Sequence, residues 1–146
     1  MAAGSVAIAR GQVIAHPYSR TVTDLDNLLA TLGSLNTAQV HVNVHEAKSL
    51  LGGAFTERLV VGSCVLSMVT GLASSGWGSP FLQELGLSDL RFRSPVYAGD
   101  TVSAVSEVLD VSAGPDGLSV IRARVTGHNQ NGDVVVEVTR TFGMQT

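Results

Sequence analysis

The order of apolar and polar positions in the first half of the chain has the period of helices. Thr23 and Asp26 have the spacing of a capping box, and the leucines around them recur at helical spacing: Leu25, Leu28, Leu29 and Leu32. These residues predict a short amphipathic helix that ends at Gly33-Ser34. Residues 1–15 are small and weakly patterned, so this segment is interpreted either as a tail or as an edge strand.

Two more helices are predicted further along the chain. Asn43 is placed to cap a short helix over residues 44–51, which Gly52-Gly53 would end. Residues 59–74 are apolar nearly all round, a pattern typical of a helix that is buried on most of its sides. Small and polar residues interrupt this run, and it is shorter than the roughly 20 residues that a spanning helix needs, so no membrane segment is expected.

From residue 85 onward the period changes to alternation, which predicts strands. The expected strands cover residues 87–93, 101–110, 118–128 and 133–144. Turn residues separate them at 95–100, where Gly99 is placed for a positive φ, at 114–117 and at Asn131-Gly132. We therefore predict an antiparallel meander that wraps the buried helix, which is an α+β fold.

Composition narrows the classes of function. The chain has 146 residues, 45% of them apolar, which suits a single domain over residues 1–146. It has 14% charged residues and a net charge of −3, so the basic surface that nucleic acid or an anionic membrane requires is not expected. So little charge on an apolar chain favours burial of part of its surface in a homodimer.

The lone Cys64 has no partner for an internal disulfide, and the first residues lack the pattern of an export signal, so we expect a cytoplasmic protein.

Two backbone segments have the residue types for chemistry next to a carbonyl group. His41 stands at the end of the short polar turn 36–40, and Gly62 opens the apolar helix with a free backbone N–H. A histidine that moves a proton and an N–H that stabilises a developing oxyanion suit reactions at the α-carbon of a thioester or ketone. This hypothesis requires that both groups converge on one cavity.

Three segments together resemble the MaoC-type dehydratases, the family of R-specific enoyl-CoA hydratases. They are Leu-Asn-Thr-Ala-Gln-Val-His at 35–41, Phe-Thr-Glu-Arg-Leu-Val-Val-Gly at 55–62 and Phe-Arg-Ser-Pro-Val-Tyr-Ala-Gly-Asp-Thr at 92–101. The resemblance covers roughly residues 20 to 143. It implies a hot-dog fold, in which an antiparallel sheet holds a long central helix, and a dimer that binds an acyl thioester near the subunit contact. Coenzyme A or an acyl carrier protein would carry the acyl group, with no other cofactor.

The resemblance also implies roles for individual residues. His41 would protonate the α-carbon, and the Gly62 N–H would hold the thioester oxygen. Asn36 stands where the family has the aspartate that activates water, and an amide cannot take a proton from water. The remaining expected site residues bind substrate: Val61, where the family has a histidine, Ser63 and Thr70.

Each of these residues also has an ordinary structural interpretation. A histidine at the end of a turn is often structural or at the surface, and Asn36 has the residue type that bonds its own backbone in turns. Gly62 would also allow close packing of the helix, and Ser63 and Thr70 would bond back to preceding carbonyl groups. These alternatives stay open at this point.

Other chemistry-bearing residues are given structural roles. His41 and His45 lack a third ligand nearby, so no metal site is expected. Asp26 is a helix cap, although it is also an outside candidate to replace the missing carboxylate. Cys64 is interpreted as a small buried apolar residue. A second group is expected to be solvated: His16, His128 and the strand arginines Arg91 and Arg93, which with Arg58 could instead meet phosphates of coenzyme A.

The sequence therefore leads to one hypothesis and two alternatives. The first is a hydratase or dehydratase that interconverts 2-enoyl and 3-hydroxyacyl thioesters. The alternatives are a hot-dog module that binds an acyl group or a partner without chemistry, and an enzyme that performs thioester hydrolysis or another elimination. The loop 74–80 would either border the acyl pocket, with Trp77 as a wall, or be a surface connection anchored by that aromatic residue.

Overall fold

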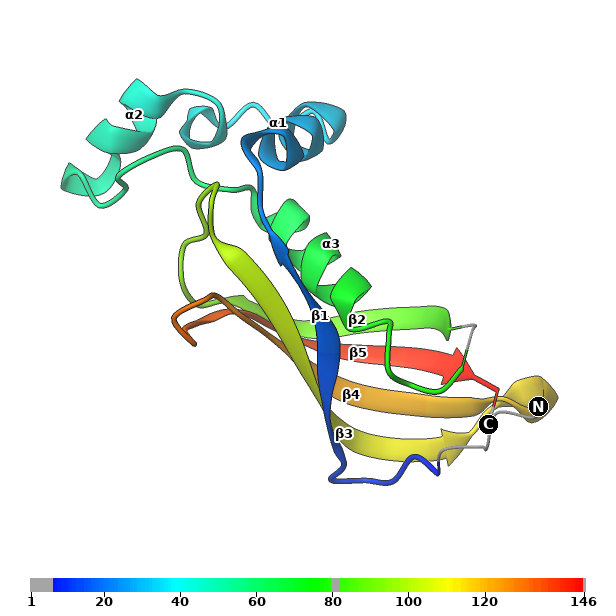
Figure 1. Ribbon diagram of the computed structural model, residues 1–146. Coiled ribbons are helices and arrows are strands. Elements are labelled where there is room, and N and C mark those ends of the chain that lie inside the picture. The colour runs from blue at the N-terminus through cyan, green and yellow to red at the C-terminus, as the bar shows by residue number, and fades with distance from the viewer. Residues whose placement is uncertain (1–6, 80–81, 146) are drawn as a thin grey trace.

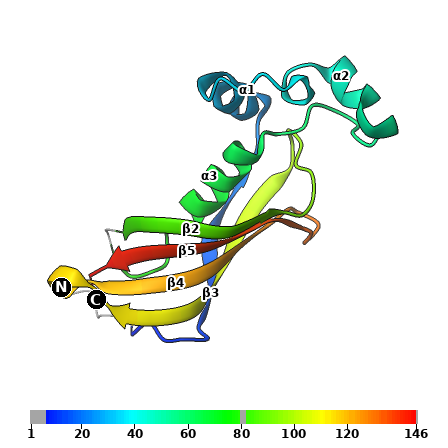
Figure 2. The same cartoon turned by 180° about the vertical axis from the view of Figure 1, so that it is seen from behind.

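The computed structural model describes residues 7–79 and 82–145. One antiparallel sheet of five strands, in the order β1-β3-β4-β5-β2, curves around the helix α3 (Gly62–Leu72). The helix lies on the concave face of the sheet, and the opposite face carries no α-helix (Figures 1 and 2). The expected α+β hot-dog architecture is confirmed.

The middle of the sheet is the predicted meander. β3 (Thr101–Ala113), β4 (Ser119–His128) and β5 (Val134–Met144) follow one another through the two expected turns. β2 (Leu82–Phe92) departs from the prediction, because it pairs with β5 at the far edge and not with β3, the next strand in sequence. Apolar alternation sets which face of a strand is buried, but it does not specify the neighbouring strand.

The opposite edge of the sheet is β1 (Val13–Thr21), which pairs with β3. The N-terminal segment, interpreted as a tail or an edge strand, thus contributes to an edge strand that begins at Val13, and residues 1–6 lie outside the described part of the chain. The turn that leads into β3 contains Gly99 with φ +99°, so the predicted positive φ is confirmed.

Helix α1 (Asp24–Gly33) begins with the predicted capping box, in which Thr23 and Asp26 each accept a hydrogen bond from the other's backbone N–H. Its amphipathic face is reversed, however. The side chains of Leu25, Leu29 and Leu32 are 63–64% exposed, whereas Asn27 and Thr31 are buried. A stripe of leucines normally faces the protein core, so this helix contacts its own chain through its polar side.

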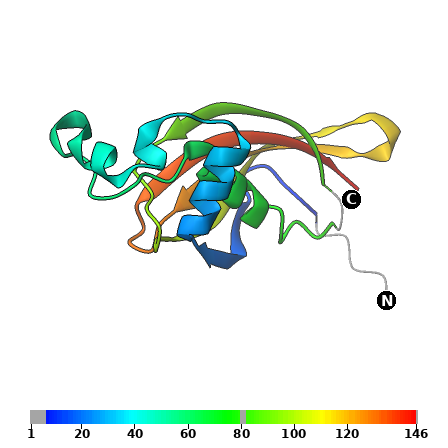
Figure 3. The ribbon, with the colours of Figure 1, turned by 90° about the horizontal axis from the view of Figure 1, so that it is seen from above.

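Helix α2 (Val44–Ser49) is capped by Asn43 as predicted, since its Oδ1 accepts from the N–H groups of His45 and Glu46. Two 3₁₀ turns flank this helix, η1 (Gln39–His41) and η2 (Leu50–Gly52), so the helix predicted over 44–51 ends two residues early. Figures 1 and 3 show α1 near the N-terminal end of α3, with α2 further out from the sheet.

Helix α3 is shorter than the predicted 59–74 because tertiary partners hold the segment before it in an extended form. The Val60 N–H donates to the Val96 carbonyl at 2.9 Å, and the Val61 N–H donates to Asn27 Oδ1 at 2.9 Å. On its inner side the helix packs closely on β4: a Cβ added at Gly127 would lie 2.6 Å from Val69 Cγ2. Glycine at this position therefore allows the helix to approach the sheet.

Among the residues that the structure describes, no helix has both the length and the apolar character that a membrane span requires.

Candidate active site

The His41 side chain is held by the segment that precedes α3. Its Nδ1 lies 2.8 Å from the Leu59 carbonyl oxygen, and the Leu59 N–H donates to the Val40 carbonyl at 3.1 Å. A carbonyl oxygen can only accept, so in the neutral imidazole Nδ1 carries the proton and Nε2 carries the lone pair. One backbone carbonyl thus orients the ring and sets its tautomer, as required of a group that takes or gives a proton.

Gly62 is the first residue of α3. The preceding residue, Val61, contributes no capping side chain. Within the described residues, the N–H groups of Gly62 and Ser63 donate to no backbone or side-chain acceptor. Unpaired N–H groups at a helix start attract an oxygen that carries negative charge. The start of α3 can therefore donate hydrogen bonds to a ligand.

His41 and Gly62 line the same cavity, which has a volume of about 390 Å³. The required convergence of the two groups is therefore present. The cavity walls are mostly apolar. The apolar side chains on them come from the segment before α3, from α3, from strands β2 and β5 and from the loop after β2: Phe55, Leu59, Val60, Val65, Phe92, Val96 and Val135. Such walls suit an acyl chain, and they strengthen electrostatic interactions by excluding water.

The Phe92 ring lies directly against Gly62. A Cβ added at Gly62 would be 2.7 Å from Phe92 Cζ, closer than carbon atoms approach in proteins. Phe92 stands at the end of the edge strand β2, and 52% of its surface is exposed. Glycine is therefore the residue that leaves room for this ring beside the helix start.

Asn36 does not line this cavity. Its Oδ1 accepts the Ala38 N–H at 2.9 Å, which is the turn geometry typical of asparagine. The side-chain NH₂ has no partner among the described residues, so it remains a possible donor to water. The structural interpretation of Asn36 is confirmed, and its role in catalysis stays a prediction.

The three expected substrate-binding residues lie at different places on or beside α3, and none lines the cavity of His41. Val61 is buried and joined through its N–H to Asn27, whereas Ser63 is exposed. Thr70 lies two turns further along the helix, where its hydroxyl donates back to the carbonyl groups of Leu66 at 2.8 Å and Ser67 at 3.2 Å. Their roles toward a substrate stay predictions.

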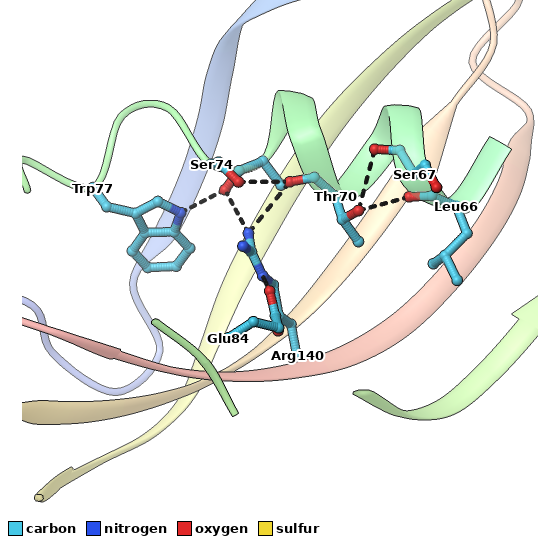
Figure 4. A network of polar contacts seen from close by, with 8 residues as sticks. Leu66, Ser67, Thr70, Ser74, Trp77, Glu84 and Arg140 are labelled. Atoms are coloured by element: carbon cyan, nitrogen blue, oxygen red, sulfur yellow. Dashed lines mark hydrogen bonds and ion pairs between the residues drawn. The ribbon is translucent and has the colours of Figure 1, made fainter. Parts of the chain in front are cut away.

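Thr70 belongs to a polar network at the C-terminal end of α3 (Figure 4). The buried Arg140 guanidinium donates to the carbonyl groups of Thr70 and Ala73, both at 3.3 Å, and to Glu84 at 2.6 Å. The Trp77 indole N–H donates to the Ala73 carbonyl at 2.6 Å, and its ring meets Phe142 edge-on at 4.8 Å. Trp77 is therefore the anchor of its loop, and it does not line the cavity of His41.

His16 contradicts the sequence interpretation, because it is buried and not solvated. Its Nδ1 donates to the Ser75 carbonyl at 2.6 Å, and its Nε2 lies 2.7 Å from the Ser106 hydroxyl. Burial lowers the pKa of this histidine below its ordinary value, and the positive charge of Arg140 adds to the shift. Strand alternation did not reveal this burial, because the loop 74–79 that covers β1 is distant in sequence.

Other candidates have structural partners away from the cavity. Asp26 caps Thr23 and pairs with Arg20, and the hydrogen bonds from Thr23 lower the pKa of its carboxyl group. Arg58 pairs with Asp24, and burial raises the pKa of the Cys64 thiol, as expected for a buried apolar cysteine. Within residues 7–79 and 82–145 no group of acidic, histidine or cysteine side chains could hold a metal ion.

One polar contact near the site was missed by the sequence analysis. Asn27 on α1 donates through Nδ2 to the His41 carbonyl at 2.9 Å, and its Oδ1 accepts the Val61 N–H. A signal was present in the sequence, since Asn27 and Thr31 are polar and share one helical face. Nothing local, however, indicates that this face is the buried one.

Comparison with known proteins agrees with this geometry. The chain is 31% identical over 115 residues to the β-methylmalyl-CoA dehydratase of Chloroflexus aurantiacus, and the match covers 79% of this chain and 32% of that protein. It is 34% identical over 118 residues to the mesaconyl-CoA hydratase of Cereibacter sphaeroides, covering 80% and 32%. The chain thus spans about a third of the length of the curated relatives it matches.

Among solved structures, an R-hydratase from Pseudomonas aeruginosa superposes with a TM-score of 0.75 at 24% identity, covering 94% of this chain and 83% of that one, which supports the fold. The model of the MaoC like domain matches residues 6–131, which are most of the chain. The chain therefore belongs to the MaoC-like domain family, because this model matches most of its length and because its sheet wraps around a helix as the sequence motifs implied.

Proposed function

We propose that this domain interconverts 2-enoyl and 3-hydroxyacyl thioesters by adding or removing water, with the acyl group carried by coenzyme A or by an acyl carrier protein. The observation that supports this most directly is the shared cavity of His41 and Gly62. The two matched relatives are named as a dehydratase and a hydratase of CoA thioesters, which supports the same reaction class.

The proposed dehydration uses one base. The thioester oxygen accepts a hydrogen bond from the Gly62 N–H, which stabilises the negative charge that develops there when the α-proton leaves. His41 takes this proton at Nε2, since its Nδ1 is occupied by the Leu59 carbonyl. The bond between the β-carbon and the hydroxyl oxygen then breaks, and the hydroxyl leaves as water with a proton from His41. Hydration is the reverse sequence.

In this scheme Asn36 orients the water or the hydroxyl group. An amide NH₂ donates a hydrogen bond to oxygen but removes no proton, so His41 has to serve as both acid and base. Val61, Ser63 and Thr70 are proposed to contact the rest of the substrate once a second subunit completes the site. No cofactor beyond the carrier of the acyl group is proposed.

The test is hydration of crotonyl-CoA and of a longer enoyl-CoA, followed by loss of absorbance of the conjugated thioester. His41→Asn is the informative variant, because its amide can still donate to the Leu59 carbonyl while the Nε2 base is gone. We expect its kcat to fall by about 10²- to 10⁴-fold. His45→Ala is the control, since His45 is exposed and lies outside the cavity, and its rate should be unchanged.

Equal rates in wild type and His41→Asn would contradict the proposed mechanism. Mass analysis separates the other reactions on the same scaffold, because hydration adds one water to the acyl-CoA and hydrolysis releases a free acid.

A module that binds acyl groups without chemistry is the second candidate. It is favoured by one observation, which is that the side chain at the family's aspartate position is an amide engaged in its own turn. Saturable binding of crotonyl-CoA without turnover, in the wild type as in His41→Asn, would support this candidate over the enzyme.

We also propose that the domain forms a homodimer. β2 pairs with β5 on one side and is the open edge of the sheet on the other, and it exposes Leu85, Leu87 and Phe92. Sedimentation at several concentrations tests this, and a monomer throughout would contradict it. Within the cell we propose a cytoplasmic location, supported by the single free cysteine.

A further inference from the structure

The buried amide of Asn27 stands out on helix α1. The side chain is 1% exposed, although asparagine is usually at the surface, and three of the four leucines of the same helix are exposed. Burial of an amide is unfavourable unless its donors and acceptors are paired, so the partners of Asn27 indicate why it is there.

These partners are backbone groups in the two segments that carry the candidate site. Nδ2 donates to the carbonyl group of His41 at 2.9 Å, and Oδ1 accepts the N–H of Val61, the residue before Gly62, at 2.9 Å. The Thr31 hydroxyl, one turn further along α1, donates to the same Oδ1 at 3.4 Å. A single planar group therefore connects the backbone of the proton-transfer residue His41 to the backbone of Val61, which directly precedes the oxyanion donor Gly62.

A second connection runs alongside the first. His41 Nδ1 donates to the Leu59 carbonyl, and the Leu59 N–H donates to the Val40 carbonyl. The two connections restrain the segment 40–41 against the segment 59–61 at separate points. Among the described residues, the side chain of Asn27 is the one group on α1 that hydrogen-bonds to both segments. Its loss would leave the Leu59 bonds as the remaining restraint, and the imidazole would shift relative to the helix start.

We infer that Asn27 is a positioning residue, which sets the distance and the orientation between the His41 imidazole and the Gly62 N–H. Asn27 touches no substrate in this role, since it is absent from the cavity wall. The inference rests on the proposed hydratase or dehydratase function for its kinetic consequence. Its structural content, the coupling of the two groups by one amide, is independent of turnover.

The test compares Asn27→Leu with Thr31→Val. Leucine has the branched shape of asparagine but neither polar end, whereas Thr31→Val removes the weaker contact to the same amide and leaves both bridge bonds. We expect Asn27→Leu to lose about 10²-fold in kcat, since a displacement on the scale of 1 Å has this cost. KM should change less than about threefold, because the apolar cavity walls remain. Thr31→Val should keep its kcat.

NMR supplies a reading that does not depend on activity. In ¹⁵N spectra the wild type should show the His41 tautomer with the proton on Nδ1. In Asn27→Leu we expect displaced His41 side-chain and Gly62 amide resonances, with the His41 proton still on Nδ1 because the Leu59 carbonyl remains, and in Thr31→Val neither displacement. If the wild type is inert toward every enoyl thioester, the proposed function fails, and these spectra still decide the inference.

A folded Asn27→Leu that keeps its kcat within threefold, or that retains the wild-type His41 and Gly62 resonances, would overturn the inference. Equal losses in Thr31→Val would do the same, since they would indicate a general effect on helix docking. If Asn27→Leu does not fold, Asn27→Asp decides instead, because it keeps the acceptor for Val61 and removes the donor to His41.

Discussion

The contact between Gly62 and Phe92 leads to a prediction about a single methyl group. In Gly62→Ala the new Cβ would lie 2.7 Å from Phe92 Cζ and 3.0 Å from Cε1, so the ring must move by roughly 1 Å to restore ordinary van der Waals contact. Phe92 is half exposed, so the ring can move without disturbing the core. The displaced ring and the methyl group would then occupy the space beside the Gly62 N–H.

Stability should change little. Alanine is favoured over glycine inside a helix by about 1 kcal/mol, which offsets the cost of moving the ring. We therefore expect the free energy of unfolding to stay within about 1 kcal/mol of the wild type. Activity should fall far more, because loss of one oxyanion donor costs about 10²- to 10³-fold in rate. The assay is kcat/KM for crotonyl-CoA, with urea unfolding of the same samples.

Gly71→Ala is the matched control. It makes the same substitution in the same helix, and nothing lies within 4 Å of the added Cβ. It should raise stability by up to about 1 kcal/mol and leave kcat/KM unchanged. The reasoning is refuted if Gly62→Ala keeps kcat/KM within threefold of the wild type, or if Gly71→Ala loses as much activity as Gly62→Ala.

Three further changes test other parts of the molecule. Asn36→Asp restores a carboxylate and should raise kcat at least about tenfold, with Asn36→Ala as control; an unchanged rate would show that the amide does not limit catalysis. Burial lowers the pKa of His16 below its ordinary value, so His16 of the unfolded chain takes up a proton before His16 of the folded protein as the pH falls. We therefore expect Tm to drop between pH 7.5 and 5.5, and to drop less steeply in His16→Gln. Equal slopes in the two proteins would assign the effect to other groups. Arg140→Met should lower the free energy of unfolding in urea by about 1–3 kcal/mol, because Arg140 is buried. Arg124→Met, which removes an exposed ion pair, should lower it by less than about 1 kcal/mol. Similar losses in the two variants would refute a stabilising role for the Arg140 network.

Local signals in the sequence were sufficient to predict the structural elements that depend on neighbouring residues. The Thr23 and Asp26 box, the Asn43 cap, the positive φ of Gly99 and the turns of the meander all depend on residues within a few positions of one another. The apolar run and the alternating strands predicted a sheet wrapped around a helix, the family resemblance implied the same arrangement, and the structure confirms it. His41 and Gly62 were proposed from their residue types and positions; they are 21 positions apart in the sequence and line one cavity.

Contacts between distant segments decided the rest. The alternating pattern of β2 is the same whether the strand pairs with β3 or with β5, and the helical period of α1 is the same whether its leucines face inward or outward. Buried Asn27 and His16 have hydrogen-bond partners 14 to 90 positions away, which are carbonyl, hydroxyl and N–H groups. The sequence by itself determined the elements and the residues able to perform chemistry. The tertiary structure alone decided which polar groups are paired and which remain free, because that depends on the backbone that each side chain meets after folding.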